Sequence, residues 1–379
     1  MAGSGTCWCG NPDLLPFSES YRRCPTCETL VATEVPPAAS LTVTDDERDF
    51  YGRRYFEERA VAAGFPPLRE RARLDLPERC LHWLRTILAY QPPPAAVLEI
   101  GSAHGGFVAL LRWAGYDATG LDLSPSTNEF ARTAFGIPVL DGPLDQQHIP
   151  AGSLDAVAAM DVLEHVPNPL DLLMRAAALL RETGIVLLQT PCYPEGASLG
   201  DLRAAKHRFL EHLHAEHLHL FSKTAVKKLC AAAGLSHIVF LPAVFEHYDL
   251  FAIAAGFEPA AGPPNELIRR LTASPSGRMI DALLQKDDAV RSLASRLAGS
   301  AADGEARLRV IEEQGRRLEE LDAERNNLRG ELEDLRRHFE ASEADREARL
   351  RVIEEQGRRL GELDAERNNL RGELEDLRR

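Results

Sequence analysis

Short apolar runs alternate with helix-forming segments between residues 95 and 256, and this alternation restricts the fold more than any other feature of the chain. Ser124-Pro125 and Ser222 provide helix start signals, and Gly234 provides a stop signal. Strands and helices in alternation predict an α/β fold, in which helices cover a parallel sheet. The predicted strands are 96–100, 117–123, 137–140, 154–160, 184–190, 236–241 and 248–254, and the predicted helices are 107–114, 126–135, 170–180 and 225–233.

Composition divides the 379 residues further. Apolar residues make up 44% of the chain but are concentrated in the alternating region, so that region can bury a core. The last part is mostly Glu, Arg and Leu and cannot bury a core alone. The predicted parts are a cysteine-rich module (1–40), a helical lead-in (41–94), the α/β domain (95–256), a linker with a helix (257–303) and a repetitive helical segment (304–379).

A glycine-rich turn lies between the first predicted strand and helix of the α/β domain, in the sequence Val97-Leu-Glu-Ile-Gly-Ser-Ala-His-Gly-Gly-Phe107. Glycines allow a tight turn and a close approach of the backbone to a ligand. The following helix N-terminus offers free N–H groups and the positive end of a dipole, which suit a carboxylate or a phosphate. A tight turn without a ligand is the competing interpretation.

Asp122 ends the next predicted strand, about 20 residues after the turn, where an acid can accept hydrogen bonds from both hydroxyls of a ribose. This spacing favours a nucleoside ligand, either NAD or S-adenosylmethionine (SAM). The alternative is that Asp122 merely begins the turn before Ser124-Pro125.

Three segments resemble motifs of class I SAM-dependent methyltransferases: Glu99-Ile-Gly-Ser-Ala-His-Gly, Leu121-Asp-Leu-Ser, and Asp155-Ala-Val-Ala-Ala-Met-Asp-Val-Leu-Glu-His-Val-Pro. The resemblance covers residues 95–256 and implies a Rossmann-like, seven-stranded sheet whose last strand inserts antiparallel between its neighbours. Ala103 stands where the family has its middle glycine, a departure that affects the shape of the loop. The cofactor-binding residues that the resemblance implies are Glu99, Gly101, Ser102 and Gly105 near the methionine end, Asp122 and Leu123 at the ribose, Leu144 and Asp145 near the adenine, and Asp161 at the methionine moiety.

Two other functions compete with SAM-dependent methyl transfer. An NAD-dependent oxidoreductase on a similar sheet is disfavoured, because the turn departs from G-x-G-x-x-G and the segment Met160-Asp-Val-Leu-Glu-His-Val is not typical of dehydrogenases. A non-catalytic assembly protein with a methyltransferase fold is disfavoured by the intact Glu99, Asp122 and Asp161, although Ala103 leaves this alternative open.

Histidines supply the candidate catalytic groups. SAM carries an activated methyl group, so the protein needs only to align the acceptor and, for many acceptors, to remove a proton. His165 follows the fourth strand and is one candidate base; a structural side chain is its alternative. Five histidines lie between residues 207 and 219, with a spacing that does not match a zinc helix motif. The resembling family has a similar His-Leu-x-x-Phe-Ser stretch on the acceptor side, which makes His217 and His219 further candidates.

Two cysteine pairs, Cys7-Trp-Cys9 and Cys24-Pro-Thr-Cys27, lie in the first module. Four thiolates can complete a tetrahedral zinc site, and a module this small has too little core to fold unaided. We therefore predict one structural zinc ion, with four reduced cysteines in a disordered arm as the alternative. The N-terminus has no apolar signal segment, so a reducing cytoplasm is the expected location.

The layout of a zinc knuckle, a Tyr-x-x-x-Tyr-Phe segment and a SAM domain resembles bacterial methyltransferases that act on sugars and surface glycans. A sugar or glycan acceptor is therefore the expectation, with a quinone or another small molecule as the alternative. The net charge of −14 argues against general nucleic-acid binding, because binding phosphates needs a basic surface. No apolar run long enough to span a membrane is present.

The C-terminal part repeats itself, since Glu305–Arg337 recurs as Glu347–Arg379 with one change, Glu319 to Gly361. The offset of 42 residues is six whole heptads, so the duplication keeps one apolar seam in phase. We predict a parallel coiled coil over residues 311–377 that makes the protein a homo-oligomer. With Ile311 at position a, the apolar a residues are Ile311, Leu318, Leu332, Phe339, Ile353, Leu360 and Leu374, and the d residues are Leu321, Leu328, Leu335, Leu363, Leu370 and Leu377.

Overall fold

The computed structural model describes residues 6–34, 43–59, 61, 64, 66–245 and 248–377. The chain divides into two units, Met1–Val290 and Arg291–Arg379, which are described separately. Within the described residues, none of the helices contains an apolar stretch long enough to cross a bilayer.

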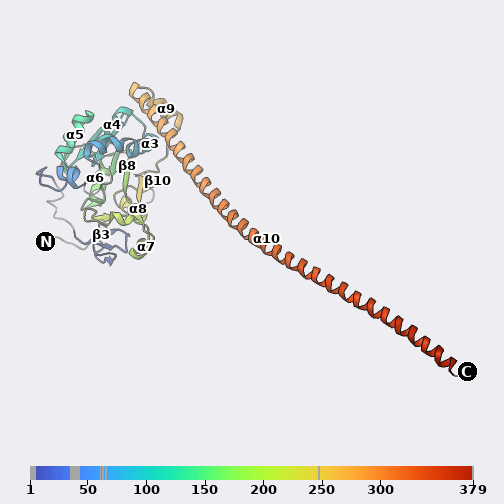
Figure 1. Cartoon of the computed structure of the whole chain (residues 1–379). Coiled ribbons are helices and arrows are strands. Elements are labelled where there is room, and N and C mark those ends of the chain that lie inside the picture. The colour runs from blue at the N-terminus through green and yellow to red at the C-terminus, as the bar shows by residue number, and fades with distance from the viewer. Residues whose placement is uncertain are drawn as a thin grey trace. The chain divides into compact units, whose positions relative to one another are not determined.

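A sheet forms the centre of the first unit (Figure 1). It has seven strands in the order β10-β11-β8-β7-β4-β5-β6. The pairings among β8, β7, β4, β5 and β6 are all parallel. This order confirms the predicted α/β fold of the class I methyltransferase type. The strands are β4 (Ala96–Ile100), β5 (Asp117–Asp122), β6 (Val139–Asp141), β7 (Leu154–Met160), β8 (Leu180–Pro191), β10 (His237–Leu241) and β11 (Asp249–Ala255).

The last strand, β11, lies between β8 and β10 and is antiparallel to both. Every residue of β11 is buried, because the strand has neighbours on both edges and helices on both faces. The predicted antiparallel insertion is therefore confirmed.

Helices cover the two faces of the sheet. Trp83 and Phe107 pack in a core on one face, and Leu173 and Val226 pack in a core on the other. Serine or asparagine side chains cap several of these helices at their N-termini, and two of the caps, Ser124 and Ser222, are the predicted start signals. The helices of the domain are α3 (Leu81–Tyr90), α4 (Gly106–Ala114), α5 (Pro125–Phe135), α6 (Pro169–Leu179), α7 (Leu199–Ala204) and α8 (Lys223–Ala232).

A second, four-stranded sheet joins the N-terminal module to the middle of the chain, in the order β1-β2-β3-β9. Three strands come from the module and the fourth, His219–Leu220, from the histidine-rich segment. The Tyr21 hydroxyl lies 2.7 Å from the carbonyl oxygens of both His214 and His217. The module is thus packed onto the α/β domain. Its strands are β1 (Leu15–Pro16), β2 (Tyr21–Arg23) and β3 (Leu30–Ala32), with β9 as the fourth.

The predicted lead-in forms turns over residues 43–52 and is mostly helical over the described residues from 53 to 90. It contains η2 (Tyr55–Arg59), α2 (Leu68–Asp75) and η3 (Leu76–Cys80), and α2 and η3 run on into α3. Two short 3-10 helices, η4 (Leu144–Gln146) and η5 (Arg208–His212), lie later in the domain. After the sheet come α9 (Pro264–Leu271) and α10 (Pro275–Asp376).

Helix α10 runs unbroken for 102 residues, so the predicted boundary between residues 303 and 304 is not a break in secondary structure. Its first turns belong to the first unit, where Ile280 and Leu284 are buried in the core. Within the second unit every described residue is exposed, including all the predicted apolar a and d residues. A helix with an exposed apolar seam over this length has a surface that a single chain leaves uncovered.

Candidate active site

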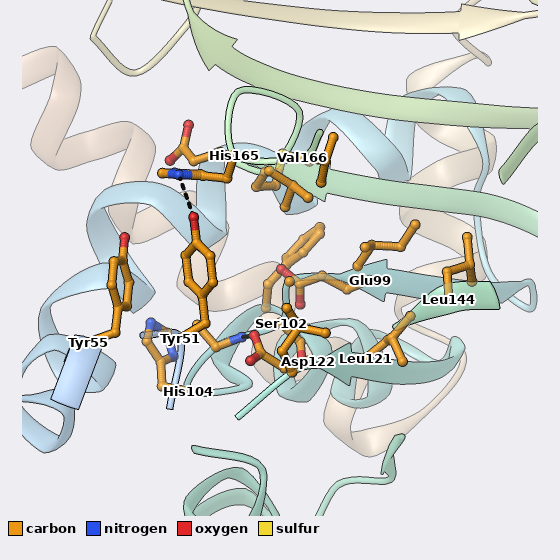
Figure 2. Close-up of a pocket in the computed structure, with 18 of the residues that line it drawn as sticks. Tyr51, Tyr55, Glu99, Ser102, His104, Leu121, Asp122, Leu144, His165 and Val166 are labelled. Atoms are coloured by element: carbon orange, nitrogen blue, oxygen red, sulfur yellow. Dashed lines mark hydrogen bonds between the residues drawn. The ribbon is translucent and has the colours of Figure 1, made fainter. Parts of the chain in front are cut away.

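A pocket of about 360 Å³ opens at the carboxyl ends of β4, β5 and β7, where parallel sheets of this kind bind their ligands. Figure 2 shows Glu99 and Ser102 from the first strand and its turn, Asp122 from the second, and His165 beyond the third. The volume is within the range of small-molecule sites in proteins.

The turn after β4 has the backbone conformation that its glycines predict. Gly101 and Gly105 have φ angles of 71° and 79°, which favour glycine. Ala103, where the resembling family has glycine, takes a left-handed φ of 44°. Its backbone N–H donates to an Asp122 carboxylate oxygen at 2.9 Å, which helps to hold this strained residue in place. The substitution is therefore accommodated without loss of the turn.

Glu99 and Ser102 present unsatisfied polar atoms at the pocket. Glu99 Oε2 and Ser102 Oγ are buried and have no hydrogen-bond partner among the described residues. Burial raises the pKa of Glu99 well above its ordinary value, and the charge of Asp122 adds to this shift. Buried polar atoms normally have partners, so a bound ligand with donor groups fits this part of the pocket.

Asp122 lines the pocket at the end of β5, and its two carboxylate oxygens accept from the backbone N–H groups of Ala103 and Ser124. These bonds fix the carboxylate while each oxygen retains a further lone pair. Burial raises the pKa of Asp122. The arrangement fits the hydroxyls of a ribose, as the resemblance implies.

Asp161 ends β7 in a strained conformation, with a φ of 57°. Its carboxylate accepts from Arg79 at 3.0 Å and from Gln189 at 3.1 Å. Gln189 in turn accepts from the indole N–H of Trp83 at 2.9 Å. A left-handed aspartate that is fixed by this many partners is typical of a functional site.

His165 is the predicted catalytic histidine that lines the pocket. Its Nδ1 lies 3.0 Å from the carbonyl oxygen of Glu216, which can only accept, so Nδ1 carries the proton and Nε2 keeps its lone pair. The Tyr51 hydroxyl lies 3.4 Å from the same nitrogen (Figure 2). Burial lowers the pKa of His165 below its ordinary value of 6.5. The side chain is therefore neutral at pH 7 and can act as a base.

Four predicted site residues lie outside the pocket lining. His217 and His219 are buried, and His219 belongs to β9, opposite Val31. Gly105 packs beneath the turn, where an added Cβ would lie 2.5 Å from Ile137. Asp145 is exposed, since η4 turns its side chain toward solvent while Leu144 stays buried.

Several residues that line the pocket were not predicted. They come from the lead-in and α3, and the sequence contains no signal that these segments contact the ends of β4, β5 and β7. The aromatic run of the lead-in was visible in the sequence, but its placement over the pocket required the tertiary structure. These residues are Tyr51, Tyr55, Phe56, Arg71, Arg79 and Trp83.

The four predicted metal-binding cysteines also lie together. The sulfur atoms of Cys7, Cys9, Cys24 and Cys27 are all within 4.8 Å of one another. The Trp8 indole donates to Thr29 beside them, and both pairs of cysteines belong to one small core. Four thiolates at this separation fit a tetrahedral zinc ion.

Residues 71–238 match a family described as "Methyltransferase domain". This match agrees with the strand order of the sheet, which is that of the class I methyltransferase fold. A ubiquinone biosynthesis O-methyltransferase of Xanthomonas axonopodis pv. citri (strain 306) is 33% identical over 128 residues, which cover 31% of this chain and 54% of that protein. The protein of the same name from Bordetella avium (strain 197N) is 31% identical over 120 residues, covering 29% and 48%.

The chain thus spans about half the length of the curated relatives it matches. Among solved structures, magnesium protoporphyrin IX methyltransferase from Synechocystis PCC 6803 with bound SAH matches with a TM-score of 0.38 and 17% identity. That match covers 53% of this chain and 96% of the other.

The pocket geometry predicts that Asp122→Ala weakens binding of SAM by about 1.5–3 kcal/mol, the usual contribution of hydrogen bonds to a charged group. Isothermal titration calorimetry measures the change. Asp145→Ala is the matched control and should bind as the wild type does, because Asp145 is exposed outside the pocket lining. Equal affinities of the wild type and Asp122→Ala would contradict the placement of the ribose.

Proposed function

We propose that this chain transfers the methyl group of SAM to a hydroxyl of a small phenolic or quinol-type molecule. The observation that carries the proposal is the pocket itself, in which unsatisfied Glu99 and Ser102 atoms and the fixed Asp122 carboxylate share one cavity with the neutral imidazole of His165. The cofactor supplies an activated methyl group when bound. The chain then needs to position the acceptor and take up its proton.

The pocket residues have different proposed roles along its length. Asp122 accepts from the ribose hydroxyls, and Glu99 and Ser102 offer partners to the polar groups beside it. Asp161, held by Arg79 and Gln189, stands next to the reacting end. At that end Nε2 of His165 accepts the acceptor's hydroxyl proton, while the bond from Nδ1 to the Glu216 carbonyl fixes the ring and stabilises the imidazolium that forms.

The aromatic lining supports a flat, apolar acceptor. Tyr51, Tyr55 and Phe56 line the pocket near His165, and Trp83 lines it from α3. Such side chains pack well against an aromatic ring. The curated relatives are named for an O-methylation step in ubiquinone biosynthesis, which agrees with an acceptor of this kind. The sugar or glycan acceptor rests on layout alone and stays a prediction.

Incubation with methyl-labelled SAM tests the acceptor class. We expect label in alkylated catechols and none in nucleotide sugars, with mass spectrometry placing the methyl group on oxygen. Asp161→Asn, which changes a residue beside the reacting end, should lower the rate. Label in the nucleotide sugars alone would overturn the phenolic acceptor and favour the glycan prediction.

A base role for His165 predicts that His165→Asn lowers kcat by about 10²–10⁴-fold while SAM affinity stays unchanged. Because burial lowers the pKa of His165, its base form persists below pH 6.5, so the wild-type rate should decline only on the acid side of that value. The variant should lack this acid decline. His237→Asn on the exposed edge of β10 is the control and should behave as the wild type does.

We also propose that Cys7, Cys9, Cys24 and Cys27 hold one zinc ion, and that the metal keeps the histidine-rich segment in place. The module touches that segment through the pairing of β3 with β9 and through the Tyr21 hydroxyl. The same segment provides the Glu216 carbonyl that fixes His165. Loss of the metal would therefore loosen the acceptor side of the pocket more than the ribose side.

Elemental analysis of protein purified without added metal should find about one zinc per chain. Removal of the zinc, or Cys24→Ser, should lower turnover of the acceptor while leaving most of the SAM affinity. Cys192→Ser, which changes a cysteine outside the cluster, is the control and should retain both zinc and turnover. Native protein without zinc, in which all four clustered thiols react freely, would contradict the site.

A further inference from the structure

The residues on either side of the exposed apolar seam of α10 indicate which kind of helix can pair with it. With Ile311 at position a, the flanking positions of each heptad are e and g. In a parallel, in-register pair of helices, each g residue faces the e residue of the next heptad on the other chain. In an antiparallel pair, g faces g and e faces e.

The g and e residues are complementary in the parallel arrangement. Among the described positions, none of the g–e pairs joins two like charges. One pair, His338 with Glu343, joins an imidazole and an acid. Asp345 faces Leu350, and Val352 faces Gly357. The oppositely charged pairs are Arg317–Asp322, Glu324–Arg329, Glu331–Arg336, Arg359–Asp364 and Glu366–Arg371.

The antiparallel arrangement is less complementary. With full overlap of residues 317–373, g–g contacts would join Arg317 with Glu373 and Glu331 with Arg359, but also the like charges of Glu324 with Glu366 and of Asp345 with Asp345. The acidic g residues are Glu324, Glu331, Asp345, Glu366 and Glu373, and the basic ones are Arg317 and Arg359.

The arginines at position a follow the same rule, whereas the polar residues at position d, which are Gln314, Ser342, Arg349 and Gln356, lie outside it. Arginine occupies position a at residues 325, 346 and 367, and each arginine directly follows an acidic g residue. In a parallel pair, the preceding g residue of the partner borders the hole into which an a side chain packs. Each arginine at position a therefore has a carboxylate beside it on the other chain. Leucine at most d positions, together with charged a residues that two strands leave partly hydrated, favours a dimer over a trimer.

We infer that α10 binds α10 of a second copy of this chain as a parallel, in-register, two-stranded coiled coil, specified by the g–e charges. The partner is the same chain because each helix carries both halves of every pair. The inference goes beyond the proposed catalytic function, since the residues involved all lie outside the pocket.

Two charge-reversal variants of the full chain test this inference. The g variant combines R317E, E324R, R359E and E366R, and the e variant combines D322R, R329E, D364R and R371E. Each variant alone should weaken the dimer by at least about tenfold, because its pairs become like-charged. An equimolar mixture should recover the wild-type dimer, since the two reversed sets complement each other only when the helices are parallel.

Analytical ultracentrifugation at micromolar concentrations reads out both results. A wild type that sediments as a monomer would overturn the inference and leave a solvated single helix with its own intrahelical ion pairs, such as Arg325–Asp322. A mixture that fails to recover the dimer would overturn the parallel orientation. The same variants should bind SAM with the affinity of the wild type. Sedimentation therefore tests the dimer, and SAM affinity tests the proposed function separately.

Cysteines at position d test the register, because the repeat also permits a shift of 42 residues. In register, L328C and L370C chains should each form disulfides with their own kind under mild oxidation. A disulfide between residue 328 of one chain and residue 370 of the other would overturn the in-register arrangement. The seven natural cysteines all precede residue 231, so peptide mass mapping separates the two products.

Discussion

The hydrogen bonds that tie the turn after β4 to the end of β5 hold the cofactor side of the pocket together. The backbone N–H groups of Gly101 and Ser102 donate to the Leu121 carbonyl at 2.7 and 3.1 Å, and that of Ala103 donates to Asp122. These bonds satisfy the turn's own donors and orient the Asp122 carboxylate at once. Because they require left-handed backbone at Gly101 and Ala103, the turn has little freedom to relax. The turn and the Asp122 carboxylate are therefore preorganised before any ligand enters.

A second constraint comes from the N-terminal module, which is far from the pocket in sequence. Pairing of β3 with β9 places Val31 opposite His219, and the backbone N–H of His219 donates to the Glu164 carbonyl. The same stretch gives the Glu216 carbonyl to His165. One small sheet thus links the cysteine cluster to the segment that orients the proposed base. His217 and His219 belong to this scaffold and are absent from the pocket lining, and the His217 ring packs against that of His165 with the ring centroids 4.9 Å apart.

Buried charge is concentrated beside the reacting end. Burial raises the pKa of Asp249 to about 8, and the charge of nearby Asp161 adds to this shift. Burial also raises the pKa of Glu164 well above its ordinary value. Arg79 lies against Asp161 and offsets part of this negative charge. The ion pair of Asp161 with Arg79 is the part of this cluster that lines the pocket.

Local physics determined much of this protein from its sequence. The strands Ala96–Ile100 and Leu154–Met160 match their predicted bounds. Buried parallel strands are short apolar runs, and the glycine or aspartate that follows each run marks its end. The turn and Asp122 could be placed for the same reason, since spacing alone brings adjacent strand ends together. The sequence also encodes the charge pattern of α10, because heptad positions depend only on helical periodicity. Tertiary structure alone decided which histidine reaches the pocket, that Tyr51, Tyr55 and Arg79 line it, and that the cysteine module is one sheet with β9. Those contacts join segments far apart along the chain, and their free energy comes from surfaces that exist only once both segments have folded.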